Sequence, residues 1–321
     1  MGHYTRRDFL RISGLLAAAA GLSSLQARAV AAGLERLADG LPRVAWIQGQ
    51  SCSGCSISLL NSEQPGPAKL ITEYISLVFH QNLGAAQGDD VAPLLEQIRQ
   101  AGDYILVVEG SIPARMPEAC MLAGRPVADW ILDLAGPASV IMAAGTCAAF
   151  GGIPGAEGNP TGAQGVMGFL ASQGLSTRGR VVNCPSCPTH PSSMVGTLAY
   201  AADQGYPEVH PDLLTPTMFY GSSTHDDCPR FHYYAKHHFA QRFGEQEGCL
   251  FKLGCLGPLT FTECPDRQWN GGVNWCVRAS APCVGCSSPH FARYRDFPLY
   301  RKGEDLHPVG YTDEDRQGGA S

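Results

Sequence analysis

Short apolar runs alternate with amphipathic segments over the first two-thirds of the chain. Runs long enough for buried strands lie at 43–48, 104–108, 138–143 and 180–182. Apolar residues at helical spacing lie at 91–101, 127–134 and 191–202. Strands that alternate with helices in this way predict a parallel sheet with helices packed against it.

The alternation fades after about Gly205. Glycine, proline, aromatic residues and cysteine dominate from there on, although 233–243 could form a helix. We therefore expect an α/β, flavodoxin-like domain over residues 42–204 and a loop-rich domain over 205–300. The second domain is expected to be organised by bound cofactors rather than by a large core, and residues 301–321 to form a loose tail.

Cysteines follow three of the predicted strands directly. Cys52 and Cys55 come after the first strand, Cys147 after the third, and Cys184 and Cys187 after the fourth. The carboxyl ends of parallel strands lie at one edge of a sheet, where α/β proteins bind their ligands. These cysteines, distant in sequence, are therefore expected to converge at that edge.

The first 29 residues have the form of an export signal. Arg6 and Arg7 precede an apolar stretch at 12–25, and the segment 27–29 (Ala-Arg-Ala) fits a cleavage site. This predicts a twin-arginine signal peptide over 1–29 and a periplasmic protein that is exported folded. The alternative is an amphipathic helix or a membrane anchor, but the apolar stretch is shorter than the ~20 residues of a membrane span.

Composition narrows the chemistry. Thirteen cysteines among 321 residues exclude a framework of disulfides alone, because an odd number leaves one thiol unpaired. A net charge of −6 without a run of Lys and Arg argues against a nucleic-acid partner. Exported thiols tend to become disulfides, but a protein that folds around its cofactor before export keeps them as ligands.

The first group of candidate ligands is the one at the sheet edge. It consists of Cys52, Cys55 and Cys147 with either Cys187 or Cys184 as the fourth member. Four soft thiolates suit a 4Fe–4S cluster. A Cys-x-x-Cys segment by itself also suits a redox dithiol or half of a zinc site.

Two further groups lie in the loop-rich part. The second group is His225, Cys228, Cys249 and Cys255, and the third is Cys264, Cys276, Cys283 and Cys286. The second could hold zinc or a cluster with one imidazole ligand. For the third, the alternative to a cluster is a four-cysteine zinc ribbon. Cys120 stays outside these groups and is expected to pack as a small buried hydrophobe.

Seven short motifs carry a family resemblance. They are 48–55 (QGQSCSGC), 108–113 (VEGSIP), 145–152 (GTCAAFGG), 185–191 (PSCPTHP), 225–228 (HDDC), 253–258 (LGCLGP) and 283–286 (CVGC). Together they resemble the small subunit of a periplasmic NiFe hydrogenase over nearly the whole mature chain. Many members of the family have proline at the position of Cys276. In having cysteine there, the chain resembles the nickel–iron–selenium (NiFeSe) subgroup.

The resemblance implies a set of three clusters. The first group would hold a proximal 4Fe–4S cluster, with Cys187 favoured over Cys184. The second group would hold a distal 4Fe–4S cluster near the surface. The third group would hold a medial cluster between them, and its four cysteines imply 4Fe–4S rather than the 3Fe–4S of relatives with three.

The same resemblance implies the function. The chain would relay electrons between the nickel–iron site of a hydrogenase large subunit and an external acceptor such as a c-type cytochrome. It would contain no catalytic acid, base or nucleophile, and Glu109 is interpreted as structural. No transmembrane anchor is expected in the mature chain. The alternatives are a stand-alone multi-cluster carrier, a relative of the Complex I cluster subunit, and a structural zinc protein.

Overall fold

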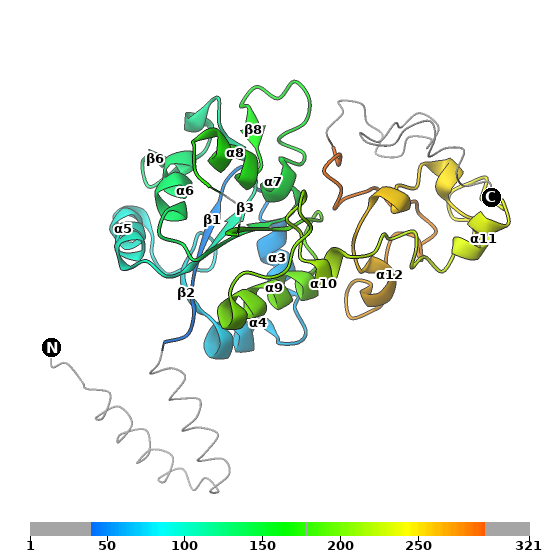
Figure 1. Ribbon diagram of the computed structural model, residues 1–321, viewed down its shortest axis with the longest axis horizontal. Helices are drawn as coiled ribbons and strands as arrows, with labels where there is room; N and C mark the ends of the chain where they lie inside the picture. The colour runs from blue at the N-terminus through cyan, green and yellow to red at the C-terminus, as the bar shows by residue number, and fades with distance from the viewer. Residues whose placement is uncertain (1–39, 177–178, 293–321) are drawn as a thin grey trace, which may run out of the picture.

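The main element of the fold is a five-stranded, fully parallel sheet. The computed structural model describes residues 40–176 and 179–292, so the predicted signal peptide, the tail and residues 293–300 lie outside the described residues. The strands, in sheet order, are β2 (Ser76–His80), β1 (Arg43–Gln48), β3 (Ile105–Glu109), β7 (Val140–Ala144) and β9 (Val181–Cys184) (Figure 1). Counted along the chain, this is the order 2-1-3-4-5 of flavodoxin-like proteins, which confirms the predicted fold class.

Helices cover both faces of the sheet (Figure 1). One face carries α5 (Val91–Ala101), α6 (Val127–Ala135) and α8 (Val166–Ser172), and the other carries α3 (Gly54–Leu60) and α9 (Pro191–Gln204). Alternate residues of β1 serve the two faces: Ala45 and Ile47 join the first core cluster, and Val44 and Trp46 the second. Burial on both faces explains why the strands are continuous apolar runs in the sequence.

The loop-rich part contains short elements around a small core. Its helices are α10 (Thr217–Tyr220), α11 (Phe231–Ala235), the 3₁₀ turns η4 (Phe251–Leu253) and η5 (Gly257–Leu259), and α12 (Cys264–Arg267). Its core consists of Ala240, Leu250, Trp275 and Val277 with three of the candidate ligands, Cys255, Cys264 and Cys283. The division at residues 204 and 205 stays a prediction.

The remaining described elements are short segments of the first part. They are α4 (Pro67–Lys69), the π-helix η1 (Leu70–Tyr74), η2 (Gly88–Asp90), β4 (Ile112–Pro113), η3 (Pro117–Ala119), β5 (Met121–Leu122), β6 (Arg125–Pro126), α7 (Thr146–Phe150) and β8 (Ala163–Gln164). Of these, α7 matters most for the site, because it carries Cys147 directly after β7.

The differences from the expectations include one helix and one strand. The predicted helix at 233–243 is wrong, because the helix is only α11 and ends near Lys236. Beyond it, the Ala240 N–H donates to the Cys249 carbonyl at 3.0 Å, so this segment pairs with the strand-like chain around Cys249. Strand β2 was not predicted, because it lies at the sheet edge and only Phe79 and His80 are buried in it.

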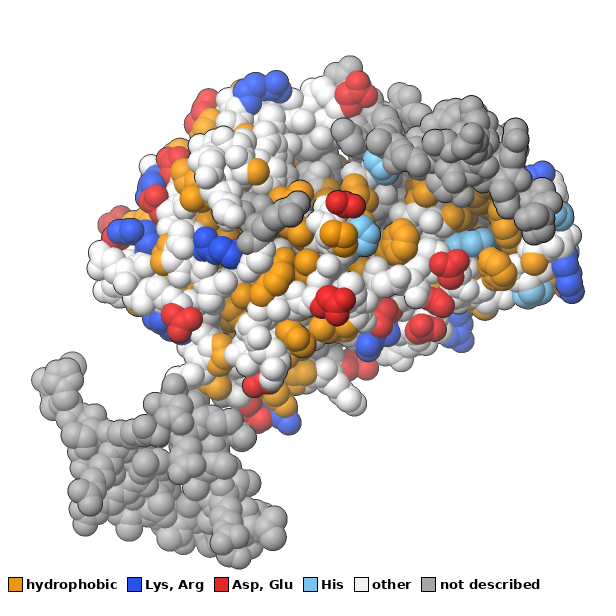
Figure 2. Space-filling model, in the orientation of Figure 1, with side chains coloured by type: hydrophobic (Ala, Val, Ile, Leu, Met, Phe, Trp, Pro, Cys, Tyr) orange, Lys and Arg blue, Asp and Glu red, His pale blue; other side chains and the backbone are white. Residues whose placement is uncertain are grey.

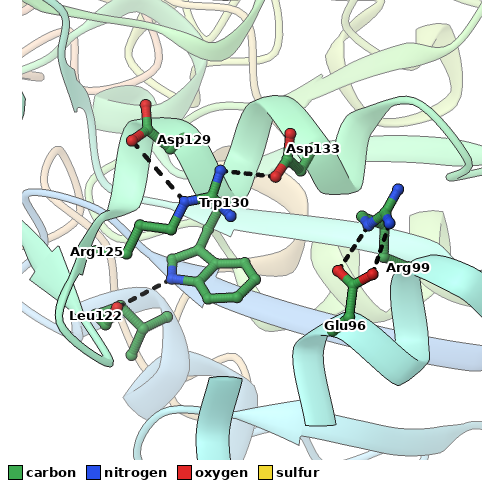
Figure 3. A network of polar contacts seen from close by, with 7 residues as sticks. All are labelled: Glu96, Arg99, Leu122, Arg125, Asp129, Trp130 and Asp133. Atoms are coloured by element: carbon green, nitrogen blue, oxygen red, sulfur yellow. Dashed lines mark hydrogen bonds and ion pairs between the residues drawn. The ribbon is translucent and has the colours of Figure 1, made fainter. Parts of the chain in front are cut away.

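A charged network lies over the outer surface of α6 (Figure 3). The Arg125 guanidinium lies 4.7 Å above the Trp130 ring and forms ion pairs with Asp129 at 3.9 Å and Asp133 at 2.7 Å. The indole N–H of Trp130 donates to the Leu122 carbonyl at 3.0 Å. Exposed pairs of this kind contribute roughly 0–1 kcal/mol each, so the network helps to orient α6 while the buried core supplies most of the stability.

Candidate metal centres

The first group converges at the carboxyl edge of the sheet. Cys52 and Cys55 follow β1, Cys147 lies in α7 after β7, and Cys187 follows β9. Two glycines allow this approach. A Cβ on Gly145 would lie 2.6 Å from the Cys55 Sγ, and a Cβ on Gly152 would lie 2.7 Å from the Cys147 Sγ. Both glycines also have positive φ, at +89° and +53°, which side chains rarely adopt. Any other residue at these two positions would therefore strain the backbone and collide with a thiol.

The surroundings of Cys55, Cys147 and Cys187 favour the neutral thiol. Burial raises the pKa of the Cys55 thiol to about 12. Burial also raises the pKa of Cys147 to about 11, and the nearby Cys187 and Cys52 add to this shift. Without a cation Cys55 and Cys147 would stay protonated, whereas bound iron would hold them as thiolates. This is the environment expected of structural cluster ligands rather than of a reactive dithiol.

Cys184 lies apart from this group. It is fully buried as the last residue of β9 and packs in the helix-covered core with Met194 and Leu198 of α9. Burial raises the pKa of its thiol to about 12, opposed by a hydrogen bond with Thr197. Cys187 is instead the residue whose charge acts on Cys147. The geometry therefore offers Cys187 to the first group and assigns Cys184 to the core.

A buried carboxylate holds the Cys52–Cys55 loop in place. The two Glu109 oxygens accept hydrogen bonds from the Cys55 N–H at 3.0 Å, the Trp46 indole at 3.0 Å, the Gln48 amide at 3.1 Å, and both the N–H and the hydroxyl of Ser56. Glu109 is 2% exposed, and its satisfied oxygens compensate its desolvation. These contacts give Glu109 a part in holding the Cys52–Cys55 loop, and the absence of a catalytic role for it stays a prediction.

His80 continues this network. Its Nδ1 accepts from the backbone N–H groups of Asn82 at 3.1 Å and Leu83 at 3.3 Å, so the proton lies on Nε2. Nε2 is 3.1 Å from the Ser56 hydroxyl, which donates onward to Glu109. Burial lowers the pKa of His80 to about 4, although the Glu109 charge opposes this shift.

Acid is expected to destabilise the fold through His80. Its pKa is depressed in the folded protein, so its contribution is complete above the unfolded value near 6.5 and is lost as the pH falls toward 4. Between pH 7 and pH 5 the loss is about 2 kcal/mol. The unfolding temperature, measured against pH, should fall clearly less steeply in His80→Gln than in the wild type. The surface variant His232→Gln should retain the wild-type slope, and equal slopes for all three proteins would contradict this role.

The second group surrounds a histidine in an aromatic setting. Burial raises the pKa of Cys255 to about 11, and the charges of nearby Cys249 and Cys228 add to this shift. A Cβ on Gly257 would lie 3.6 Å from the Cys255 Sγ and 3.7 Å from the His225 Cα and Cβ, which places these two candidate ligands together. Burial lowers the pKa of His225, opposed by Asp226. A neutral imidazole is the form that binds a metal.

Arg230 supports the second group, although no sequence pattern identified it. Arg230 is 8% exposed, and its guanidinium donates to the Gly248 carbonyl at 3.0 Å and the Ser280 hydroxyl at 2.8 Å. Its backbone N–H donates to the Cys228 Sγ at 3.4 Å. A buried cation beside thiolates offsets their negative charge. Only its position two residues after Cys228 could have suggested this role.

The third group lies around α12 and the following turns. Burial raises the pKa of Cys264, and the Thr262 hydroxyl lies 3.6 Å from its sulfur. The charge of Cys276 acts on both Cys264 and Cys286, and that of Cys286 acts on Cys283. All four predicted members are therefore neighbours.

The three groups form a chain in which the third is in the middle. The Cys187 backbone hydrogen-bonds the Cys286 thiol, whose pKa burial nevertheless raises to about 12. The Thr146 hydroxyl, next to Cys147, donates to the Cys286 carbonyl. At the other end of the group, the Cys283 N–H donates to the Cys255 Sγ at 3.3 Å. The contacts thus run from the first group through the third to the second.

The donor sets fit iron–sulfur clusters. Eleven thiols and one imidazole are soft ligands, and buried hydroxyls such as Thr262 lie beside the sulfurs. Two side-chain oxygens adjacent to candidate ligands, Ser186 Oγ and Thr224 Oγ1, are buried without a hydrogen-bond partner in the protein. Among the residues described, no three His, Cys, Asp or Glu side chains converge to the tighter spacing of a single-ion site.

Comparison with known proteins identifies the class as a hydrogenase electron-transfer subunit. The family model for the C-terminal part of NiFe/NiFeSe hydrogenase small subunits matches residues 220–298, and that of the NADH ubiquinone oxidoreductase 20 Kd subunit matches residues 52–201. The periplasmic NiFeSe hydrogenase small subunit of Desulfomicrobium baculatum is 36% identical over 306 residues, which cover 89% of this chain and 96% of the relative. The hydrogenase-2 small chain of Escherichia coli is 39% identical over 88% of this chain and 76% of its own.

Solved structures agree with this match. The NiFeSe hydrogenase from Desulfovibrio vulgaris Hildenborough aligns with a TM-score of 0.75 and 37% identity, over 81% of this chain and 98% of that chain. The chain therefore belongs to the family of NiFe and NiFeSe hydrogenase small subunits. It is the electron-transfer subunit of a hydrogenase, an oxidoreductase acting on H₂. Small subunits of this family carry iron–sulfur clusters, which removes the structural zinc alternative.

Proposed function

We propose that this chain relays electrons between the nickel–iron site of a large subunit and an external acceptor through three clusters held by its own residues. The observation that carries this proposal is the chain of contacts from the first group through the third to the second. Bound clusters would supply reversible one-electron chemistry. The protein's part is to hold them in sequence, to exclude water and to adjust their potentials.

The proposed ligands are the twelve residues of the three groups. Cys52, Cys55, Cys147 and Cys187 would hold a proximal 4Fe–4S cluster in the domain 42–204. Cys264, Cys276, Cys283 and Cys286 would hold a medial 4Fe–4S cluster, and His225, Cys228, Cys249 and Cys255 a distal one, in the domain 205–300. Ten of these residues, all but Cys52 and Cys276, are buried or partly buried, and hydrogen bonds reach the sulfurs of Cys228, Cys264 and Cys255, which supports the assignment.

The large subunit is proposed to cover the surface beside the first group. Cys52 is exposed, and the next turn of chain, α3, presents Ile57 at 58% and Leu60 at 42% exposure on one face. Ile153, which follows Gly152, is 51% exposed. Figure 2 shows hydrophobic side chains gathered over the middle of the face on which α3, α9 and α10 lie. Apolar surface of this kind typically marks a protein interface.

The opposite end of the relay is proposed to serve a soluble acceptor such as a c-type cytochrome. His225 is only half-buried and packs edge-on against Phe231 and Tyr234, with ring centroids 5.1 and 4.7 Å away. Phe231 is itself 42% exposed, so a short aromatic path leads from the distal group to the surface.

The proposed location is the periplasm, reached by the twin-arginine route. Within residues 40–176 and 179–292, the structure has no helix with the length and hydrophobicity of a bilayer span.

Replacing His225 by alanine is expected to slow electron exit more than hydrogen activation. Loss of one ligand perturbs only the terminal cluster, while the large-subunit site is untouched. Relative to H₂/D⁺ exchange, turnover with the external acceptor should fall at least ~10-fold. This is the lower end of the loss seen when a residue that only hydrogen-bonds a metal ligand is replaced. Exposed His232→Ala serves as the matched control. Unchanged acceptor turnover in His225→Ala would contradict the proposed exit.

Co-purification tests the proposed assembly. An affinity-tagged chain produced in its own host should bring down a nickel-containing large chain and reduce an acceptor with H₂. The alternative, a stand-alone multi-cluster carrier, predicts iron and sulfide in the tagged chain without nickel and without H₂-dependent reduction. The hydrogenase match over residues 220–298 favours the first outcome.

A further inference from the structure

Ser186, between Cys184 and Cys187, has a backbone conformation that a side chain rarely adopts. Its φ is +111°. The other non-glycine residues with positive φ among those described lie between +48° and +60°, in the ordinary left-handed region. A φ of +111° lies outside that region and is characteristic of glycine, so a serine here is strained.

The same residue carries a buried hydroxyl without a partner. Ser186 is 1% exposed, and its Oγ makes no hydrogen bond in the protein. Buried polar atoms almost always find a partner, and an exception calls for a physical explanation. Among the described residues, Thr224 Oγ1 repeats the feature directly before His225, whereas Asn183 has a partner for its amide N–H₂ and lacks one only for Oδ1.

The loop cannot relax to remove either cost. The Ser186 N–H donates to the Thr146 hydroxyl at 2.9 Å, and the Ser186 carbonyl accepts from the Thr146 N–H at 3.0 Å. The Thr146 hydroxyl in turn donates to the Cys286 carbonyl. Ser186 is thus fixed between the first and third groups, one residue before Cys187. Glycine would fit this backbone without strain, and it would leave no orphaned hydroxyl.

We propose that the Ser186 hydroxyl donates a hydrogen bond to a sulfur atom of the proximal cluster and raises the reduction potential of that cluster. This inference rests on the proposed function. Donation to sulfur stabilises the more negative, reduced state of a cluster. It also gives the buried hydroxyl its missing partner, so that one contact explains both anomalies. Ser186 is a positioning and tuning residue, since it does not bind iron.

Two substitutions separate the hydroxyl from the strain. Ser186→Ala removes Oγ and keeps the strained Cβ, while Ser186→Gly removes both. Electron paramagnetic resonance (EPR) redox titration of the heterodimer should show the proximal potential lowered to the same extent in both variants. The expected change is about ten-fold in the one-electron reduction equilibrium, or about 59 mV. Ser139→Ala, which removes a hydroxyl at the opposite edge of the sheet, should leave the potential unchanged.

A second readout does not depend on the potential. The reduced wild-type cluster should show a hyperfine coupling to one strongly coupled exchangeable proton that disappears in Ser186→Ala. An unchanged potential in Ser186→Ala, or a shift in only one of the two Ser186 variants, would overturn the inference. Absence of a proximal cluster from the wild type would instead contradict the proposed function.

Discussion

Replacing Cys187 by alanine is expected to remove the proximal cluster and to disconnect the large subunit from the relay. The four thiols of the first group lie at the carboxyl edge of the sheet. The loss of one of them would leave iron open to solvent on the side of the exposed Cys52. Because outer metal partners already cost roughly 10- to 100-fold, loss of a direct ligand should cost more than 100-fold in acceptor turnover. Iron content should fall by about four atoms per chain.

Cys184→Ala is the matched control for this prediction. Cys184 packs between β9 and α9 with the other buried residues of that core, so its truncation should cost about 1 kcal/mol of stability and keep the cluster. Iron content and acceptor turnover should stay near wild type. The opposite pattern, with Cys184→Ala losing iron and Cys187→Ala keeping it, would reverse the ligand assignment.

Replacing Cys276 by proline is expected to convert the medial cluster from 4Fe–4S to 3Fe–4S. Cys276 lies beside Cys264 and Cys286 and would supply the fourth corner. Without it, one iron should be lost per chain, and the oxidised enzyme should gain the paramagnetic signal of a 3Fe–4S cluster. The medial potential should rise by more than the ~59 mV of a ten-fold change in a one-electron equilibrium.

Cys276→Ala controls for the rigidity of proline in this turn. Both variants should show the new oxidised signal, because both lack the thiolate. A medial 4Fe–4S signal that persists in both would show that Cys276 is not a ligand. If only Cys276→Pro lost every medial signal, the cause would be the altered backbone at proline and not the missing thiolate.

The sheet and the convergence of the first group could be predicted from the sequence because both follow from local patterns. The continuous apolar runs at β1, β3, β7 and β9 reflect burial on two faces, and cysteines directly after strands must lie at one edge. Strand β2 escaped prediction because its exposed edge dilutes the apolar signal. The helix expected at 233–243 gave way to pairing with the chain near Cys249, a long-range contact that no local pattern contains.

The arrangement within the site depended on such long-range contacts. The third group follows the second in sequence, yet in space it lies between the first and the second. Cys286 contacts the first group, and Cys283 contacts the second. The residues that fix the loops, including Thr146 and Arg230, act across tens of residues on partners that spacing does not reveal. Spacing alone also left Cys184 and Cys187 equivalent; the family resemblance favoured Cys187, and the burial of Cys184 beneath α9 adds a structural reason.

The most direct test of the account is the metal and sulfide content of the purified heterodimer, combined with reductive EPR titration. Three 4Fe–4S clusters predict about twelve iron atoms and twelve acid-labile sulfides per small subunit, beyond the iron of the nickel–iron site. The titration should resolve three reducible centres, with no zinc in stoichiometric amount. Fewer than three centres, or zinc in place of iron at any of the three groups, would contradict the relay.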